Sequence, residues 1–401
     1  MTGAQPQNGQ SPDAARRATL LAYGCTYSMI IGVSSVMPLL PFLAKTFAIS
    51  ISHVGLVISA FTLPGIFFTP LGGILADRYG HKAVLIPSLI LFCLGGAGCA
   101  AAPDFPTLIA LRFIQGVGAA SFGTLNVAIL ADTFSGQELS KYIGWNMTLL
   151  SFFTAAFPFL GGVLGDQHWR LAFLLPLTSL PVLLLTFYTP LRKPDPAARS
   201  PQPIRGLLHA VAAPRIRMLL ILTFLTFIML YGPVITCLPV LGAHKFHQNA
   251  GSIGMLLIAS SLGAACVAPF TGKLSQRFSL RFLLMTAQIF YIASLALIPL
   301  VPTFHWLIVP IFFFGLGQGL NIPNLQADLA KSAPKEMRAS VMAANGMLLR
   351  TGQTLAPLAF TAMIDTQGMD WGFYAGVGLA CTLLILAGFF LPKIRWTETA
   401  A

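Results

Sequence analysis

The chain has 401 residues, of which 56% are hydrophobic and only 9% are charged, and its mean hydropathy is +0.77. A soluble protein of this length could not cover its surface with so few charges, so the composition excludes a soluble globular domain and predicts a polytopic α-helical membrane protein. The net charge of +12 would suit a nucleic-acid binder, but the basic residues lie in short segments between apolar runs and form no stripe, so we expect no nucleic-acid partner.

Twelve apolar runs follow one another along the chain, each of about 20–27 residues and therefore long enough to cross a bilayer as a helix. We expect membrane spans at residues 18–44, 53–75, 83–102, 106–131, 142–164, 169–190, 216–241, 250–272, 282–301, 304–327, 339–363 and 371–391. An even number of spans places both termini on the same side of the membrane.

The distribution of Lys and Arg predicts which side that is. Of the 24 basic residues, 19 fall on the side of the termini, Lys45, Arg170 and Lys245 fall on the other side, and Arg112 and Arg350 lie within spans. Because cytoplasmic loops carry the excess of positive charge, we expect a multi-pass protein of the inner (cytoplasmic) membrane with both termini in the cytoplasm.

One long polar segment, rich in Pro, Ala and Arg, divides the chain into two halves. The expected domains are a cytoplasmic tail at 1–17, a six-helix bundle at 18–190, a linker at 191–215, a second six-helix bundle at 216–391 and a cytoplasmic tail at 392–401. The composition of the linker predicts a flexible segment that lies against anionic lipid headgroups.

The two halves repeat each other at a constant offset of 199 residues. Examples of the pairing are Gly55 with Gly254, Pro70 with Pro269, Arg78 with Arg277, Pro158 with Pro357, and Asp166 with Asp365. Two repeated six-helix halves are typical of a two-bundle transporter, whose binding site lies between the bundles near the middle of the membrane.

The segment "GGILADRYGHKAVL" (72–85) joins spans 2 and 3. Its Gly, Asp-Arg, Gly and basic ending resemble the signature loop of the major facilitator superfamily, and the gating positions this implies are Gly73, Asp77, Arg78, Gly80 and Lys82. By that resemblance, Asp77 would face the N-terminal end of span 11, where the helix dipole favours an anion, and would hold the halves closed on the cytoplasmic side. Arg78 and Lys82 would pair with local carboxylates or lipid phosphates. The alternative is an ordinary turn on the positive side, and the repeat of Asp77 is Gln276.

Span 4 opens with "LRFIQGVGAA" (111–120), which resembles a second signature, that of the drug–proton antiporter branch of the same superfamily. Arg112 and Gln115 are three residues apart and share one helix face. In that branch the arginine is buried and has been implicated in proton coupling. The alternative is a structural arginine that reaches outward or that satisfies backbone carbonyls of span 1.

Span 5 resembles the antiporter signature at Gly144, Pro158, Gly161 and Gly162, which predicts a bend and close helix packing. It departs from the signature at Phe153 and Phe157, where that signature has glycine. A kinked packing helix without a role in export is the alternative.

Span 10 carries a polar stripe on a helix that is otherwise apolar. Gln318, Asn321, Asn324 and Asp328 fall within about 120° of arc at 3.6 residues per turn, and Pro323 should loosen the helix beside them. Amides on a membrane helix must face protein or water. They either bind substrate or bond neighbouring helices.

Span 11 contains Arg350 in "NGMLLRTGQTLAP" (345–357), on one face with Gln353 and seven residues before Pro357. A charge in the middle of a span costs about 2.5–3.5 kcal/mol on insertion scales and is usually retained for function. Because no Asp or Glu lies in the middle of a span, Arg350 favours an anionic or polar neutral substrate. Alternatively, Arg350 bonds backbone carbonyls at a helix break, or reaches Asp328 or Asp132.

The resemblance predicts the major facilitator fold, an all-α protein of twelve helices in two pseudo-symmetric bundles that works by alternating access. The expected function is proton-driven export of a small amphipathic organic molecule, anionic or zwitterionic rather than cationic. We expect the protein to work as a monomer without a cofactor, in contact with membrane lipids. Asp77, Asp132 and Arg112 are the candidates for proton coupling, and Arg350, Gln353, Gln115, Gln318, Asn321 and Asn324 are the candidates for substrate binding. Proton-coupled uptake of an organic anion is the alternative; a membrane enzyme or receptor is a remote one.

Overall fold

The structure is a computed structural model that describes residues 11–191, 211–334 and 337–391. Most of the predicted linker and the predicted tail at 392–401 lie outside these ranges. Within them, every regular element is a helix.

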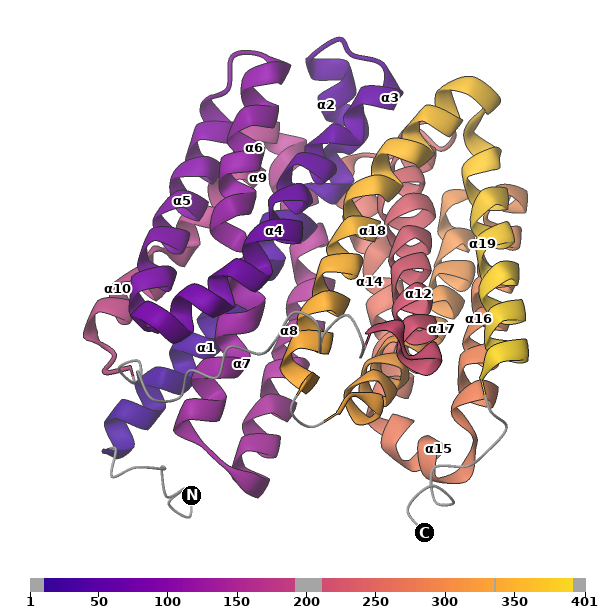
Figure 1. Cartoon of the computed structure of the whole chain (residues 1–401). Helices are drawn as coiled ribbons and strands as arrows, with labels where there is room; N and C mark the ends of the chain where they lie inside the picture. Colours follow the sequence, from indigo (N-terminus) through magenta and orange to yellow (C-terminus); the bar gives the residue numbers. More distant parts are fainter. Residues whose placement is uncertain (1–10, 192–210, 335–336, 392–401) are drawn as a thin grey trace.

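The first half folds into one bundle, which is indigo to magenta in Figure 1. In chain order its elements are α1 (Pro12–Ser34), η2 (Met37–Leu39), α2 (Leu40–Thr46), α3 (Ile51–Val54), α4 (Leu56–Tyr79), α5 (His81–Ala101), α6 (Phe105–Ala119), α7 (Phe122–Thr133), α8 (Gly136–Gln167), α9 (Trp169–Leu174), η3 (Leu175–Ser179) and α10 (Leu180–Tyr188).

The second half forms a matching bundle beside the first (Figure 1). Its elements are α12 (Pro214–Met229), the π-helix η5 (Leu230–Cys237), α13 (Leu238–His244), α14 (Ala250–Val267), η6 (Ala268–Phe270), α15 (Thr271–Arg277), α16 (Leu280–Leu297), η7 (Ile298–Leu300), η8 (Phe304–Leu307), α17 (Ile308–Ser332), α18 (Arg338–Gln367) and α19 (Met369–Phe390).

Eleven helical segments of the described chain are long and apolar enough to span a membrane. The remaining predicted span, span 11 at 339–363, is helix α18, which has 30 residues but a lower hydropathy than the other eleven. Its polar residues include Arg350 and Gln353, and α18 packs against α4 of the other bundle and against α12 and η5 of its own. The lower hydropathy of α18 therefore agrees with its position between protein surfaces.

The N-terminal helix begins earlier than the predicted boundary at residue 18. The side chain of Ser11 accepts a hydrogen bond from the backbone N–H of Ala14, and Pro12 occupies the first turn, where a missing N–H costs nothing. These two residues start the helix at Pro12, so the last part of the predicted tail is helical.

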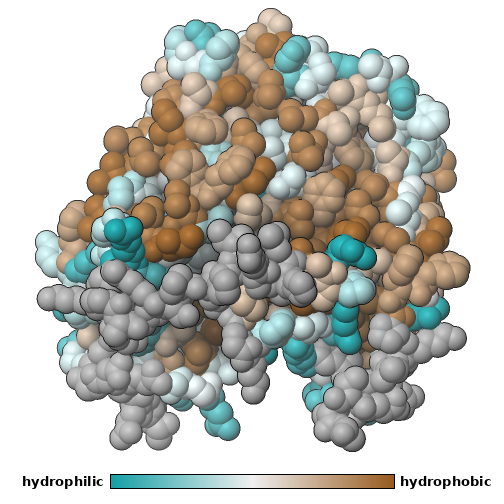
Figure 2. All heavy atoms as spheres, viewed as in Figure 1, coloured by the Kyte–Doolittle hydropathy of each residue, from teal (hydrophilic) through white to brown (hydrophobic). Residues whose placement is uncertain are grey.

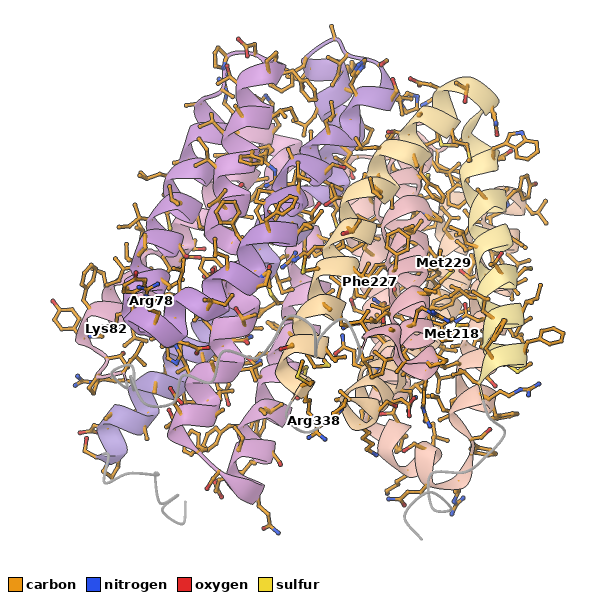
Figure 3. The ribbon with its side chains drawn as sticks, viewed as in Figure 1. Arg78, Lys82, Met218, Phe227, Met229 and Arg338 are labelled. Carbon is orange, nitrogen blue, oxygen red and sulfur yellow. The ribbon has the colours of Figure 1, made fainter. Side chains whose placement is uncertain are left out.

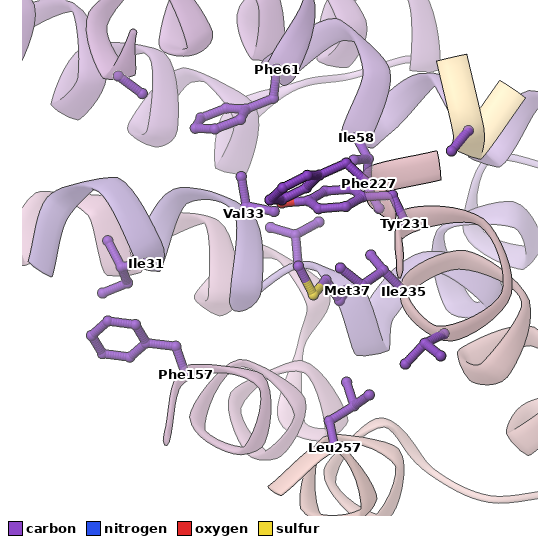
Figure 4. Packing of buried hydrophobic residues seen from close by; sticks show 14 of the residues in the cluster. Ile31, Val33, Met37, Ile58, Phe61, Phe157, Phe227, Tyr231, Ile235 and Leu257 are labelled. Carbon is purple, nitrogen blue, oxygen red and sulfur yellow. The ribbon is translucent and has the colours of Figure 1, made fainter. Parts of the chain in front are cut away.

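The first membrane segment of each half is irregular at the same repeat position. In the first half, α1 ends at Ser34 and the chain continues through η2; in the second half, α12 passes into the π-helix η5, which contains Pro233. Interrupted helices and π-turns are frequent at functional sites in membrane transporters. Both irregular segments face the junction of the two bundles, because Val33, Met37, Tyr231 and Ile235 pack close together there (Figure 4).

The outer surface is apolar over most of its height (Figure 2). Large hydrophobic side chains are exposed on helices of both bundles, for example Phe67 on α4, Phe152 on α8, Ile289 on α16 and Phe389 on α19. A belt of this kind would be unstable in water and is stable against lipid tails.

The two bundles are joined tightly at one end, which lies opposite the end where α1 starts and α19 finishes. We call these the external and cytoplasmic ends, after the orientation that the Lys and Arg distribution predicts. A Cβ on Gly55, between α3 and α4, would lie 2.5 Å from the carbonyl oxygen of Pro357, and one on Gly254 of α14 would lie 2.3 Å from that of Pro158. Only glycine allows the bundles to approach so closely at these two symmetry-related positions.

Two carboxylates complete this external closure. Asp166, at the end of α8, accepts hydrogen bonds from the backbone N–H groups of Ala250 (2.8 Å) and Gly251 (3.0 Å) of the other bundle. Its repeat partner, Asp365 of α18, accepts one from the N–H of Ser52 (2.9 Å). Each carboxylate thus caps the first turn of a helical segment across the junction.

Candidate functional site

Arg350 lies on α18 at the junction of the two bundles. Its Nη1 donates a hydrogen bond to Oε1 of Gln353 (3.1 Å), and the side chain is partly buried. A Cβ on Gly65 of α4 would come within 3.0 Å of Cδ of Arg350, so a glycine of the opposite bundle makes room for the arginine. Ser59 and Thr62 of α4 bond Thr354, one turn further along α18. Arg350 therefore sits immediately beside a direct contact between the halves.

Neither carboxylate considered from the sequence pairs with Arg350. Asp328 is buried and binds Arg215, whose Nη2 lies 2.8 Å from Oδ1 and whose Nε lies 3.3 Å from Oδ2. Asp132 lies 3.0 Å from Nε2 of His81. Within the described ranges, Arg350 has no ion-pair partner.

The aromatic residue near Arg350 is Tyr231, from the irregular segment of span 7, and it was not among the residues predicted from the sequence. Tyr231 of the π-helix η5 is close enough to Arg350 for the two groups to interact electrostatically, and its ring centroid lies 6.4 Å from that of Phe227. The interrupted helix, with a proline at position 233, was the available sequence signal for this part of the site.

The polar stripe of span 10 makes contacts within its own bundle. Nδ2 of Asn321 donates to Oγ1 of Thr226 on α12 (3.0 Å), and Nδ2 of Asn324 donates to the carbonyl of Leu320 one turn earlier (2.7 Å). Oε1 of Gln318 accepts a weaker bond from Ser260 on α14 (3.4 Å). The bonds of Asn321 and Gln318 tie neighbouring helices together, whereas that of Asn324 stays within α17, which continues as one helix through Pro323.

Arg112 is completely buried within the first bundle. Its Nε donates to the carbonyl of Val57 on α4 (3.0 Å), and its Nη1 donates to the carbonyl of Gly32 on α1 (2.9 Å) and to Oε1 of Gln115 (2.8 Å). The guanidinium also lies 4.4 Å from the ring centroid of Phe61. Arg112 thus ties spans 1, 2 and 4 together through backbone carbonyls.

Two donors of this cluster have no acceptor. Nη2 of Arg112 and Nε2 of Gln115 are both buried, and neither makes a hydrogen bond in the structure. A buried donor without a partner costs about 1–3 kcal/mol, so this position is suited to an additional acceptor such as a water molecule.

The predicted gating loop is almost entirely helical. Helix α4 runs to Tyr79, and Gly80 forms the turn with φ of 91°, a conformation that favours glycine. Gly73 differs, since a Cβ there would meet nothing within 4 Å. Asp77 is exposed and, among the described residues, makes no ion pair.

The two basic residues of this loop have different neighbours. Nζ of Lys82 donates to the backbone carbonyl of Phe187 on α10 (2.9 Å), and its predicted pairing with a carboxylate or a lipid phosphate stays a prediction. Arg78 is exposed and lies 5.3 Å from the ring centroid of Tyr79. Figure 3 shows Arg78 well separated from Arg338, where α18 begins, so the cytoplasmic ends of α4 and α18 are apart here.

The small residues of span 5 allow close packing both within the first bundle, at Gly161, and between the bundles, at Gly162. A Cβ on Gly161 would lie 2.0 Å from the carbonyl oxygen of Ser35, and one on Gly162 would lie 2.3 Å from that of Ala250. Pro158 lies inside the continuous helix α8 and presents its carbonyl to Gly254. The packing role predicted for Gly144 is wrong for this structure, because a Cβ there would meet nothing within 4 Å.

The two phenylalanines that depart from the span 5 signature form an aromatic cluster with span 1. The ring centroids of Phe153 and Phe157 lie 5.3 Å apart in a parallel arrangement, and the ring of Tyr27 meets both edge-on at 5.3 and 5.2 Å. Aromatic side chains thus occupy positions where the signature would leave only backbone.

Comparison with known proteins assigns the family. The sequence profile of the Major Facilitator Superfamily matches residues 22–347 and, in a second overlapping match, 238–398. Among curated relatives, the tetracycline resistance protein, class C, of Escherichia coli is 27% identical over 392 residues, covering 95% of this chain and 97% of that protein. The multi-drug resistance efflux pump PmrA of Streptococcus pneumoniae is 28% identical over 381 residues, covering 90% and 94%.

Solved structures show the same fold at low sequence identity. A bacterial homologue of the human lysosomal transporter Spinster, in an inward-facing and unoccupied conformation, has a TM-score of 0.77 at 16% identity and covers 96% of this chain and 99% of its own. A D-xylose–proton symporter has a TM-score of 0.76 at 14% identity, covering 94% and 97%. The profile match, the relatives and the two-bundle architecture agree, and the chain is a transporter, not an enzyme, that belongs to the major facilitator superfamily.

Proposed function

We propose that this protein is a proton-driven exporter of small amphipathic organic molecules, with anionic or zwitterionic substrates favoured over cations. Relatives that align over nearly the whole chain include tetracycline resistance proteins, a multi-drug efflux pump and a bacillibactin exporter. The resemblance of Arg112–Ala120 to the antiporter signature supports the same direction of transport.

The preference for anions is carried by one observation, which is the environment of Arg350. The guanidinium stands at the junction of the bundles, has an amide and a phenol as neighbours, and has no carboxylate partner within the described ranges. An arginine whose charge is not neutralised by the protein attracts a carboxylate or phosphate and repels a cation. Gln353, bonded to Arg350, would orient the planar guanidinium towards the ligand.

The apolar part of the substrate would rest on aromatic side chains. In the second bundle Tyr231 lies near Arg350 and its ring contacts Phe227, and in the first bundle Tyr27, Phe153 and Phe157 form a cluster. Rings from both halves can stack against an amphipathic molecule without demanding one shape.

Proton coupling would use ionisable groups of the first bundle. Asp132 with His81, and Asp77, lie at the cytoplasmic end, while the Arg112 cluster holds two buried donors without acceptors. The proton gradient is the proposed energy source, and the protein is proposed to work as a monomer in the inner membrane with both termini in the cytoplasm.

The transport cycle would alternate between a state closed at the external end and a state closed at the cytoplasmic end. The described structure is closed externally by Asp166, Asp365 and the glycine contacts, and it would open to the outside when these contacts separate. Asp77 would then meet the N-terminal end of α18 and close the cytoplasmic side.

Uptake of an organic anion together with a proton is the second candidate. Phe153 and Phe157 replace the glycines of the antiporter signature, and this specific departure favours it.

Transport into proteoliposomes separates the two candidates whatever the orientation of the protein. The probe is 1-naphthalenesulfonate, whose charge does not change with pH, so its own ionisation cannot drive accumulation. An antiporter accumulates the probe when the lumen is acidic, because protons leave as the probe enters. A symporter accumulates it when the outside is acidic.

We expect accumulation with an acidic lumen, which Arg350→Gln abolishes. Arg217→Gln, which removes an exposed arginine from the start of α12 in the same bundle, is the matched control and should transport normally. Accumulation only with an acidic exterior would replace export by uptake, and equal transport by Arg350→Gln would refute the role of the arginine.

A further inference from the structure

A pocket lies at the external end of the molecule, and Arg350 is not among the residues that line it. It has a volume of about 630 Å³ and is lined by the ends of the first helical segments of the two bundles, α2 with the turn after it and α13 with the turn after it. Helices α2 and α13 pack against each other, so the pocket spans the junction of the bundles.

The pocket is basic on its rim and apolar on its walls. Lys45 comes from the first bundle, and His244 and His247 come from the second; all three side chains are exposed. The apolar walls include Phe42 and Ile49. None of its lining residues is acidic. Lysine and histidine supply N–H donors for an anion, and the walls suit a hydrophobic body.

Two acidic groups at this end, Asp166 and Asp365, do not neutralise the rim, because they bind backbone N–H groups elsewhere. Asp166 accepts from the backbone of Ala250 and Gly251, and Asp365 accepts from the backbone of Ser52. Lys245 points away from the pocket lining, since its Nζ donates to the carbonyl of Pro299 (2.8 Å). The described part of the chain shows no ion pair at Lys45, His244 or His247.

Backbone conformation sets this place apart from the rest of the described chain. Among the described residues, the two non-glycine residues with positive φ are Ala48, at 51°, and His247, at 52°. They are repeat partners, and both line the pocket. Side-chain-bearing residues rarely adopt this conformation, and it persists where the surrounding structure enforces it. The second half places His247 and Gln248 where the first half has Ala48 and Ile49, so the strained turn carries polar groups in one bundle only.

We propose that this pocket is an external binding site for amphipathic organic anions, distinct from the Arg350 site, and that a bound anion holds the external end closed. Lys45 from α2 and His244 from α13 would contact one ligand from two bundles. Because these helices must part when the molecule opens outwards, a ligand that bridges them binds the externally closed state better and shifts the population towards it. The site does not depend on the direction of transport.

The first test is ligand-induced thermal stabilisation of the purified full-length protein with 1,5-naphthalenedisulfonate, a rigid aromatic dianion. We expect the probe to raise the unfolding temperature of the wild type and of Arg350→Gln. The double variant Lys45→Gln/His244→Gln should need at least a tenfold higher probe concentration for the same shift. Lys245→Gln, which removes the neighbouring external charge outside the pocket, is the matched control and should respond like the wild type.

The outcomes separate this site from the proposed substrate site. If Arg350→Gln loses the response and the double variant keeps it, the probe binds only at Arg350 and the external site is refuted, while the proposed function stands. Equal responses of all variants, or no response of the wild type, would also refute the external site.

The second test measures the closing effect directly. Spin labels at Pro103→Cys and Pro302→Cys, exposed repeat partners in the external loops of the two bundles, report their separation when Cys266 and Cys381 are replaced by alanine. The probe should increase the short-distance population in the wild-type background and leave it unchanged in Lys45→Gln/His244→Gln. A longer distance on binding would overturn the proposal that the anion closes the external end.

Discussion

The two halves of the molecule share one set of residues and differ in another. The shared set includes Gly55 with Gly254 and Asp166 with Asp365, and these residues form the external closure. The arginines are not shared, since the repeat partner of Arg112 is Ile311 and that of Arg350 is Ser151. The residues shared by the two halves therefore form the contact between the bundles. The arginines proposed for coupling and binding each occur in one half only.

The two arginines also differ in what surrounds them. Arg112 is enclosed in one bundle and bonded to two backbone carbonyls, whereas Arg350 stands at the junction and, among the described residues, bonds only the side chain of Gln353. A buried arginine with carbonyl partners stabilises its bundle, and one without them is available to a ligand. Substitutions of these residues should therefore differ in their effects, which are largest for the buried Arg112 and smallest for exposed groups.

Arg112→Ala should have the largest effect on stability. The carbonyl oxygens of Val57 and Gly32 would lose their buried donors, at about 1–3 kcal/mol each. Thermal unfolding in detergent should occur several degrees lower than in the wild type, and transport should be impaired although the protein is still expressed. Arg112→Lys retains a charge and one donor group, so its stability should lie between the two. An unchanged unfolding temperature for Arg112→Ala would show that the carbonyl contacts contribute little.

Removal of both external carboxylates should open the external end. Each exposed carboxylate contributes about 1 kcal/mol through hydrogen bonds and the helix dipole, so Asp166→Ala/Asp365→Ala should shift the conformational equilibrium roughly 30-fold. The spin-label pair at Pro103 and Pro302 should report a longer distance. Asp370→Ala, which removes an exposed acid from the same end, should leave the distance unchanged. A double variant that stays closed would assign the closure to the glycine contacts alone.

The single variants should rank by their hydrogen bonds. Asp166 accepts two backbone bonds and Asp365 accepts one, so Asp166→Ala should open the external end more than Asp365→Ala. The same distance measurement on each variant checks the order, and a reversed order would mean that the two carboxylates do not act as equivalent caps.

Asp77→Asn should have the smallest effect on the unfolding temperature, because Asp77 is exposed in the externally closed state. Its effect should appear in the populations instead, as a shift towards states open to the cytoplasm. Labels at Ser140→Cys and Lys273→Cys, on opposite bundles, would detect this as a longer average distance. Substitution of the repeat partner, Gln276→Ala, should leave this distance unchanged. If Asp77→Asn also leaves the distance unchanged, Asp77 does not hold the cytoplasmic side closed.

The sequence predicts the fold well because its signals are strong. The apolar runs predict twelve spans, the repeat predicts two six-helix halves, and the 72–85 segment resembles the superfamily's signature; the family match and the helices confirm the fold class. Helix boundaries are less certain, since the start of α1 depends on the cap formed by Ser11 and Pro12 rather than on hydropathy.

The site is less predictable because contacts between distant residues decide it. The pattern placed Arg112 and Gln115 on one face, but it could not show that the carbonyls of Val57 and Gly32 would be their neighbours. Likewise, the pairing of Asp328 with Arg215 and of Asp132 with His81 depends on how helices pack. Tyr231 was missed because an aromatic residue in an apolar span has no distinctive pattern.

The most direct test of the account is thermal unfolding of the wild type and of Arg350→Gln with matched panels of aromatic anions, cations and neutral amphiphiles, at about pH 6 and pH 8. The comparison is made in the Lys45→Gln/His244→Gln background, so that the external pocket does not contribute. We predict that singly charged anions stabilise the protein with Arg350 and that Arg350→Gln loses this response. Stabilisation by cations, equal in both proteins, would contradict the account and make Arg350 a structural residue.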